Sequence, residues 1–184
     1  MQVLIFILVF IMPLAALSQP SYNHLFHERA IEGGNVVVQI GSKTIVAGII
    51  SDPQSNYERV FLLTTDASGN ILSKGYWGDS TLDYFVKAIT NVGEDFVIAG
   101  SVIENSDASF FLLKLDTAFN QIFYEQYDVG VGNEGVHGLS RSKDGGYLIT
   151  GYSQTFPKIP QLNVNDGQFI IIKTDSEGKE EWTK

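Results

Sequence analysis

An apolar run that ends at an aspartate occurs three times in this chain. The copies are VFLLTTD (Val60 to Asp66), FFLLKLD (Phe110 to Asp116) and FIIIKTD (Phe169 to Asp175). A glycine that closes another apolar segment precedes each copy, at Gly48, Gly100 and Gly151, so that these glycines lie 52 and 51 residues apart. A fixed period of this length is the signature of a repeat architecture. The chain of 184 residues therefore holds three repeat units.

Each unit contains short segments rich in Val, Ile, Phe and Tyr, bounded by Gly, Asn and Asp, and none carries a persistent apolar stripe at helical spacing. This composition predicts β-strands. In the first unit we expect four strands, VVVQI (36–40), TIVAGII (44–50), VFLLTT (60–65) and ILSKGYW (71–77). The other units repeat the series, the third reaching its fourth strand at EEWTK.

The segments after the apolar runs predict turns of one design, DASGN, DTAFN and DSEGK. The leading aspartate can accept backbone N–H groups, and a glycine three residues later tolerates a positive φ. Phe119 replaces this glycine in the second unit, where we expect Asn120 to take the left-handed conformation instead. The aspartate thus ends the strand by satisfying the turn.

The apolar runs do not alternate between apolar and polar residues, so both faces of their strands should be covered. Since the chain offers no helices, the cover must come from other sheets of the same kind. Radially packed four-stranded blades meet this requirement. Gly48, Gly100 and Gly151 then mark places where the backbone of a neighbouring blade approaches closely. We expect an all-β, β-propeller-like array of about three four-stranded antiparallel blades, partial or open.

The stretch GGYLITGYSQ…FIIIKTDSEGKEEW resembles the blade repeat of secreted bacterial β-propellers. In that family a DGGYIIAG strand pair, a DxxLxKxDxxGxxxW strand and turn, and a GGxxxDxA linker recur. The resemblance covers Gly33 to Lys184 and implies a fold rather than an activity. It gives blade-like repeats at 36–84, 85–135 and 136–184, after a linker or strand at 19–35. Because closed propellers take at least four blades, we expect a fragment of a longer repeat protein, with self-association or an open stack as alternatives.

The N-terminus predicts export. An apolar segment from Val3 leads through Pro13 to Ala16-Leu17-Ser18, which predicts a signal peptide over 1–18 with cleavage before Gln19. The segment Val3 to Leu17 is shorter than the roughly 20 residues that a bilayer-spanning helix needs. We therefore expect a protein that is secreted, periplasmic or at the cell surface, without stable membrane insertion after cleavage.

Charge and cysteine content exclude several classes of function. With 21 Asp plus Glu against 12 Lys plus Arg, the formal net charge is −9, and no basic run is present. Nucleic acid is excluded as a partner because phosphate binding needs a basic face. The absence of cysteine removes disulfide frameworks, thiolate zinc sites and cysteine nucleophiles.

No catalytic motif stands out. His24 and His27 have a spacing that would suit a metal ion on a helical turn, but they follow the cleavage site and no further ligands lie nearby. His137 stands alone in an expected first strand. No G-x-S-x-G, P-loop or dinucleotide fingerprint occurs. A glycosidase needs two facing carboxylates, and the acids numerous enough to supply them are Glu94, Asp95, Glu104, Asp107, Glu125, Asp128 and Glu134.

Calcium is another use for the acids. DASGN (66–70) and NVNDGQ (163–168) are rich in oxygen ligands, although neither has the spacing of a calcium loop and ordinary turns explain both. We assign no catalytic, cofactor-binding or metal-binding residue. Aromatic residues that would suit a sugar or peptide groove are Tyr22, Tyr76, Trp77, Tyr84, Tyr124, Tyr127, Tyr147, Tyr152 and Trp182.

The sequence thus favours an exported, non-catalytic binding or scaffold module whose loops present a surface to a glycan or protein. The alternative is part of a propeller-type enzyme, either a glycoside hydrolase or a quinoprotein-like dehydrogenase.

Overall fold

The structure is a computed structural model that describes residues 31–51, 57–129, 134–153 and 168–184. These residues form strands and turns, with no helix among them. Within the described ranges, no helix has the length and hydrophobicity needed to cross a membrane. The expected all-β class is confirmed.

Twelve described strands form three antiparallel sheets of four strands each, and each sheet follows chain order. The first sheet consists of β1 (Ile31–Ile40), β2 (Lys43–Ser51), β3 (Glu58–Thr65) and β4 (Ile71–Trp77). The second sheet consists of β5 (Asp83–Val92), β6 (Asp95–Glu104), β7 (Asp107–Leu115) and β8 (Gln121–Tyr127). The third sheet consists of β9 (Glu134–Arg141), β10 (Tyr147–Ser153), β11 (Gln168–Thr174) and β12 (Glu180–Thr183). β1 begins at Ile31, earlier than the apolar run at Val36 indicated.

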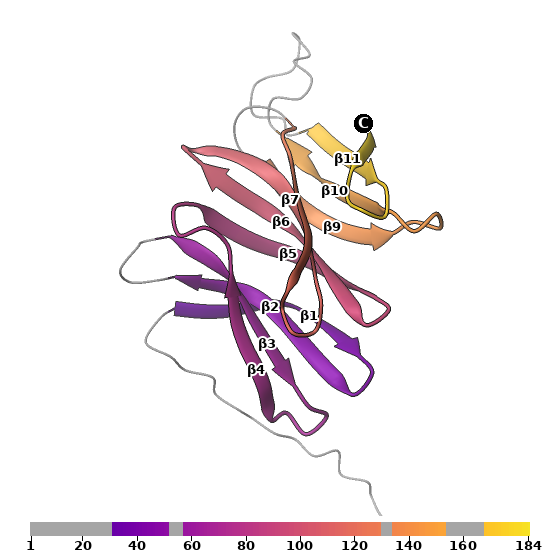
Figure 1. The fold of residues 1–184 in the computed structure, drawn as a ribbon. Helices are drawn as coiled ribbons and strands as arrows, with labels where there is room; N and C mark the ends of the chain where they lie inside the picture. Colours follow the sequence, from indigo (N-terminus) through magenta and orange to yellow (C-terminus); the bar gives the residue numbers. More distant parts are fainter. Residues whose placement is uncertain (1–30, 52–56, 130–133, 154–167) are drawn as a thin grey trace, which may run out of the picture.

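The sheets pack side by side in chain order, with the first at the bottom of Figure 1, the second in the middle and the third at the upper right. The first strands of successive sheets are in contact, β5 with β1 and β9 with β5. One hydrophobic core lies between the first and second sheets and another between the second and third. The array is open, and each sheet is packed as a blade would be.

The apolar runs differ in how completely they are covered. In the second sheet, Phe110, Phe111, Leu112 and Leu113 are all fully buried, because sheets lie on both sides. In the third sheet, burial alternates along β11, where Ile170 and Ile172 are buried but Phe169 is 68% exposed. The run in β3 is also buried on both faces, with Val60, Phe61, Leu62 and Leu63 at most 4% exposed. The expectation that both faces are covered is therefore right for β3 and β7 and wrong for β11.

The three aspartates end their strands as predicted. Oδ1 of Asp66, Asp116 and Asp175 accepts hydrogen bonds from the backbone N–H groups two and four residues later, at 2.8–2.9 Å. The left-handed position is taken by Gly69, Phe119 and Gly178, with φ of 82°, 68° and 87°. The expectation that Asn120 would take this position is wrong, since Phe119 itself adopts it.

The role predicted for the repeat glycines also needs correction. A Cβ at Gly48 would lie 1.8 Å from the carbonyl oxygen of Gly33, and one at Gly100 would lie 2.1 Å from that of Phe85. At Gly151 the carbonyl oxygen of Gly135 would be 2.3 Å away. The close backbone is thus the first strand of the same sheet rather than a neighbouring blade. A β-bulge in that strand brings the carbonyl over the glycine.

Candidate functional site

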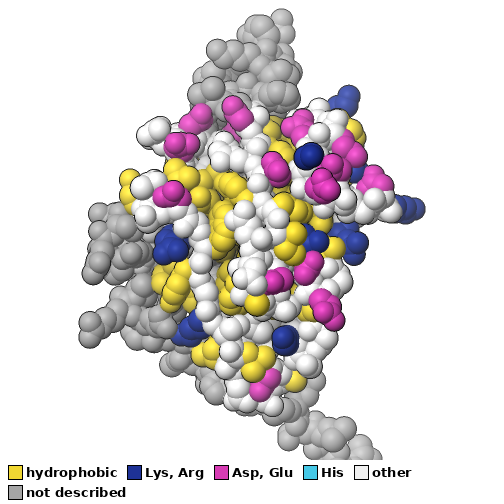
Figure 2. Space-filling model, in the orientation of Figure 1, with side chains coloured by type: hydrophobic (Ala, Val, Ile, Leu, Met, Phe, Trp, Pro, Cys, Tyr) yellow, Lys and Arg dark blue, Asp and Glu magenta, His cyan; other side chains and the backbone are white. Residues whose placement is uncertain are grey.

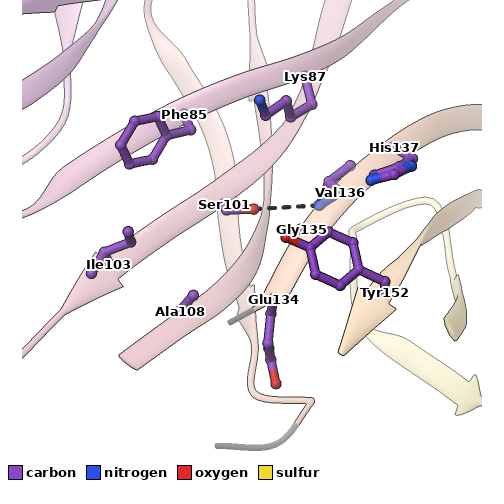
Figure 3. A pocket seen from close by; sticks show the side chains of 10 residues that line it. All are labelled: Phe85, Lys87, Ser101, Ile103, Ala108, Glu134, Gly135, Val136, His137 and Tyr152. Atoms are coloured by element: carbon purple, nitrogen blue, oxygen red, sulfur yellow. Dashed lines mark hydrogen bonds between the residues drawn. The ribbon is translucent and has the colours of Figure 1, made fainter. Parts of the chain in front are cut away.

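A pocket of about 460 Å³ lies where the second and third sheets meet. Its walls come from β5, β6 and β7 on one side and from β9 and β10 on the other (Figure 3). The lining residues are Phe85, Lys87, Ser101, Ile103, Ala108, Glu134, Gly135, Val136, His137 and Tyr152. Small-molecule sites in proteins usually occupy about 300–1,000 Å³, and this pocket falls in that range.

Glu134 is the first residue of β9, and its side chain extends away from Lys87 and His137 in Figure 3. The residue is only 6% exposed. Oε1 accepts a hydrogen bond from the Ser153 hydroxyl at 3.0 Å. Oε2 is buried and has no hydrogen-bond partner within the described part of the chain. The backbone N–H of Val129 lies close enough to the carboxyl to lower its pKa, although Oε2 has no well-formed hydrogen bond.

Burial raises the pKa of Glu134 from its ordinary value of 4.5 to about 7. The hydrogen bond from Ser153 and the backbone N–H of Val129 oppose this shift, and the negative charges of Asp128 and Asp107 add to it. A carboxyl with a pKa near neutrality holds a proton part of the time, so that it can donate or accept one at physiological pH.

Three equivalent bulges place polar side chains on the first strands of the sheets, and two of these side chains line this pocket. The register between the first and second strands skips Asn35 in β1, Lys87 in β5 and His137 in β9. All three residues are exposed. The Asn35 side chain donates a hydrogen bond to the carbonyl of Val86 at 3.2 Å, whereas Lys87 and His137 line the pocket. Bulges re-aim a side chain out of the regular pleat, and they are frequent next to binding sites.

The wall between the sheets is held by a few close contacts. The backbone N–H of Val136 donates to the Ser101 hydroxyl at 3.3 Å, a bond that joins the two sheets (Figure 3). The ring of Tyr152 lies over Gly135, where a Cβ would be 2.4 Å from the ring. His137 meets the Tyr152 ring edge to face, with centroids 5.3 Å apart. Position 135 therefore has no room for a side chain, because the Tyr152 ring covers it.

The structure separates the seven candidate acids. Four lie at the end of the array that holds the pocket, namely Glu104, Asp107, Asp128 and Glu134. Glu94 and Asp95 lie at the opposite end, in and beside the β5–β6 turn, where Asp95 is 3.2 Å from the Lys114 ammonium. Glu125 lies within the outermost strand β8. Only Glu134 among the seven lines the pocket.

A second hollow of about 450 Å³ opens between the first two sheets at the same end. Ile103 borders both hollows, and Asp83 and Glu104 face the second one. The carboxylate of Asp83 accepts a hydrogen bond from the backbone N–H of Glu58 at 2.8 Å. In the view of Figure 2, the acidic side chains lie mostly in the upper half, over the second and third sheets. Asp83, Glu104, Asp107 and Asp128 make the end of the array that holds the pocket negative.

The other sequence candidates play structural roles or fall outside the described ranges. Both carboxylate oxygens of Asp66 are occupied within the DASGN turn. No group of three His, Asp or Glu residues in the described ranges is arranged to hold a metal ion. His24, His27, Tyr22 and residues 163–167 of the second calcium candidate lie outside those ranges.

Of the candidate aromatics, only Tyr152 lines the pocket. Trp77, Tyr84 and Tyr124 form a ring cluster with Phe111 between the first two sheets. Tyr127 and Tyr147 are buried in the second core, while Tyr76 and Trp182 are partly exposed elsewhere. The sequence had not singled out Phe85, Lys87, Ser101 or Gly135. Lys87 was detectable, because polar residues precede the repeat glycines by 13, 13 and 14 positions at Asn35, Lys87 and His137.

Comparison with solved structures finds similarity to the silkworm (Bombyx mori) GH32 β-fructofuranosidase BmSUC1. A mutant of that enzyme in complex with sucrose matches with a TM-score of 0.52 and 15% sequence identity, over 85% of this chain and 38% of the enzyme. The array has a β-propeller-type fold. The enzyme without the mutation matches with a TM-score of 0.49 and 10% identity, over 87% of this chain and 39% of its own length.

The chain thus spans less than two fifths of these enzymes. At this identity the likeness concerns the fold alone. A comparison with protein families finds no match, and neither does one with curated proteins.

Proposed function

We propose that this chain is an exported β-propeller-type binding module, or part of one, that holds a sugar unit of a glycan in the pocket between the second and third sheets. The proposal rests mainly on the environment of Glu134. This residue is nearly buried, lines a pocket of small-molecule size, and has one carboxylate oxygen, Oε2, without a hydrogen-bond partner among the described residues. A half-satisfied buried carboxyl is costly to maintain unless a ligand completes its hydrogen bonding.

The chemistry of the lining supports a polyhydroxylated ligand. Lys87 can donate, the Ser101 hydroxyl and the Glu134 carboxyl can donate or accept, and Phe85 and Tyr152 offer aromatic rings. Hydroxyl groups can both donate and accept, so that a sugar can use each of these partners. The acids around the pocket and the net charge of −9 disfavour polyanionic ligands.

Export is the part of the proposal that rests on sequence, through the expected signal peptide over 1–18. A module that is secreted, periplasmic or at the cell surface meets glycans rather than nucleic acid. No cofactor is needed for such binding.

A glycan array probed with the purified protein tests the proposal, followed by calorimetric titration of the glycans that bind. Tyr152→Ala and Lys87→Met should each weaken binding by about tenfold or more, because each removes a direct contact. Lys43→Met, which changes an exposed lysine at the opposite end of the first sheet, should bind as the unchanged protein does. Absence of glycan binding, or equal loss in all three variants, would refute the proposal.

A second candidate is hydrolysis of a glycosidic bond, with Glu134 as the general acid. It is favoured by the pKa of about 7 at Glu134 and by the nearby charges of Asp107 and Asp128. Chromogenic glycosides distinguish the two candidates. Turnover that Glu134→Gln abolishes while glycan affinity persists identifies an enzyme, and binding without turnover identifies a binding module.

A further inference from the structure

Glu134 places a buried acceptor without a partner at the pocket between the second and third sheets. The residue is 6% exposed, and its Oε1 accepts a hydrogen bond from the Ser153 hydroxyl at 3.0 Å. Oε2 is buried and has no hydrogen-bond partner among the described residues. A buried polar atom without a partner costs free energy, and a charged donor compensates a carboxylate better than a neutral donor does. The environment of Glu134 therefore favours a ligand that brings a cation to Oε2.

The carboxylates at this end of the array favour the same kind of ligand. Asp107 begins β7 and Asp128 follows β8, and the negative charge of each raises the pKa of Glu134. Asp83 and Glu104 border the adjoining hollow. The summed field of these carboxylates attracts a cation and repels an anion.

The basic and imidazole side chains nearby leave Glu134 without a counter-charge. Lys87 lines the pocket from β5, but the Glu134 side chain extends away from Lys87 and His137 in Figure 3. The guanidinium of Arg59 in β3 lies over the Tyr76 ring of the first sheet, 6.0 Å from the ring centroid. Within the described ranges, none of the three pairs with the Glu134 carboxyl. The pocket thus has a basic side chain at one end and an unpaired carboxyl at the other.

We propose that the sugar unit held in this pocket carries a free amino group, and that its ammonium donates a hydrogen bond to Oε2 of Glu134. This inference rests on the proposed glycan-binding function and narrows it to amino sugars whose nitrogen is not acetylated. The ammonium and the carboxylate compensate each other on binding, so neither charge is left buried alone. The hydroxyl groups of the sugar use Lys87 and Ser101 elsewhere in the pocket.

Protonation of Glu134 gives this contact a measurable signature. Burial, together with Asp128 and Asp107, raises the pKa of Glu134 to about 7, so that the carboxyl is mostly protonated at pH 6. An ammonium beside it favours the carboxylate. Binding of an amino sugar at pH 6 should therefore release close to one proton from the protein. A neutral sugar, which can accept a hydrogen bond from the protonated carboxyl, should release none.

Calorimetric titration with three matched oligosaccharides tests this inference. Chitosan, cellulose and chitin oligosaccharides share one backbone and carry an amine, a hydroxyl or an acetamide at the same carbon. The free-amine form should bind about tenfold more tightly than the other two at pH 7. Titration at pH 6 in two buffers of different ionisation enthalpy measures the proton release.

Two matched variants assign the effect to Glu134. Glu134→Gln should abolish both the preference for the amine and the proton release. Glu94→Gln makes the same change at an exposed position at the opposite end of the second sheet, and it should keep both.

The other outcomes overturn the inference in distinguishable ways. Equal binding of the three oligosaccharides, or binding of a neutral glycan on the array but not of the chitosan oligosaccharide, overturns it and leaves the proposed glycan binding intact. Amine binding to the unchanged protein without proton release also overturns it, as does a preference for the amine that persists in Glu134→Gln. If no glycan binds, the proposed function itself fails and this inference fails with it.

Discussion

The ring of Phe119 fills the space directly above Gly75, where a Cβ would lie 2.7 Å from the ring. Phe119 belongs to a turn of the second sheet, and Gly75 lies in the outermost strand of the first. The ring also meets Phe96 edge to face, with centroids 6.3 Å apart. The Phe119 side chain thus packs against both sheets. Its backbone has the left-handed conformation that glycine adopts in the equivalent turns.

Replacement of Phe119 separates these two effects. A left-handed φ costs a residue with a Cβ about 1–2 kcal/mol, and glycine does not pay this cost. Phe119→Ala should lose the packing and keep the strain, whereas Phe119→Gly loses the packing and relieves the strain. We expect both to lower the free energy of unfolding, and alanine by about 1 kcal/mol more than glycine. Chemical denaturation measures the difference, and an alanine variant as stable as the glycine variant would contradict it.

Gly151→Ala should be strongly destabilising, by about 3 kcal/mol or more, because its Cβ would lie 2.3 Å from the Gly135 carbonyl oxygen and 2.4 Å from the Phe110 ring. Gly33→Ala is the control in β1, since the nearest atom to its Cβ would be 3.7 Å away. It should be close to neutral. Thermal unfolding compares the two, and similar melting temperatures would show that the bulge does not constrain residue 151.

The outcome at these glycines shows what the sequence could and could not predict about the fold. The period and the apolar runs predicted the strands, their order and the packing of sheet on sheet, because both depend on which residues must be buried. The bulges at Asn35, Lys87 and His137 change the register without changing composition, so the nearest backbone to Gly48, Gly100 and Gly151 was misassigned. At Phe119, packing against Gly75 outweighs the local preference of Asn120.

Glu134 should make stability depend on pH. Its native pKa of about 7 lies above the ordinary 4.5, so that the native state binds the proton more tightly than the unfolded chain. The contribution of Glu134 is therefore fully present below pH 4.5, falls as the pH rises toward 7, and amounts to at most about 3 kcal/mol. Denaturation at several pH values should show this loss in the unchanged protein and not in Glu134→Gln. A constant difference between the two across this range would be inconsistent with a raised pKa.

Lys173 should contribute to stability although it is charged. Its side chain is 8% exposed, and its ammonium lies 2.9 Å from the carboxylates of Asp144 and Glu181. It also donates a hydrogen bond to the Thr174 carbonyl at 2.7 Å. Lys173→Met removes this hydrogen bond and both ion pairs, and should cost about 1–3 kcal/mol.

Lys179→Met provides the control for Lys173. Lys179 is 71% exposed, and its ammonium lies 3.7 Å from Glu177. Loss of this surface pair should change the free energy of unfolding by less than about 1 kcal/mol. Equal effects of the two substitutions in urea denaturation would show that Lys173 is not specifically held.

The site was less predictable than the fold. The sequence named Glu134, His137 and Tyr152 among many acids, histidines and aromatics, but residues from five strands meet at the pocket. Which side chains meet depends on how the second and third sheets pack and on the bulges of their first strands. Neither can be read from composition, although the polar residue that precedes each repeat glycine by 13 or 14 positions would have indicated Lys87 and His137.

The most direct test of the account is to map the ligand by NMR, with isotope-labelled protein titrated with a glycan identified on the array. We expect the signals that move most to belong to Lys87, Ser101, His137 and Tyr152, and we expect Glu134→Gln to alter the affinity. Shifts confined to the opposite end of the sheets, around Glu94 and Lys143, would contradict the assignment of the pocket as the binding site.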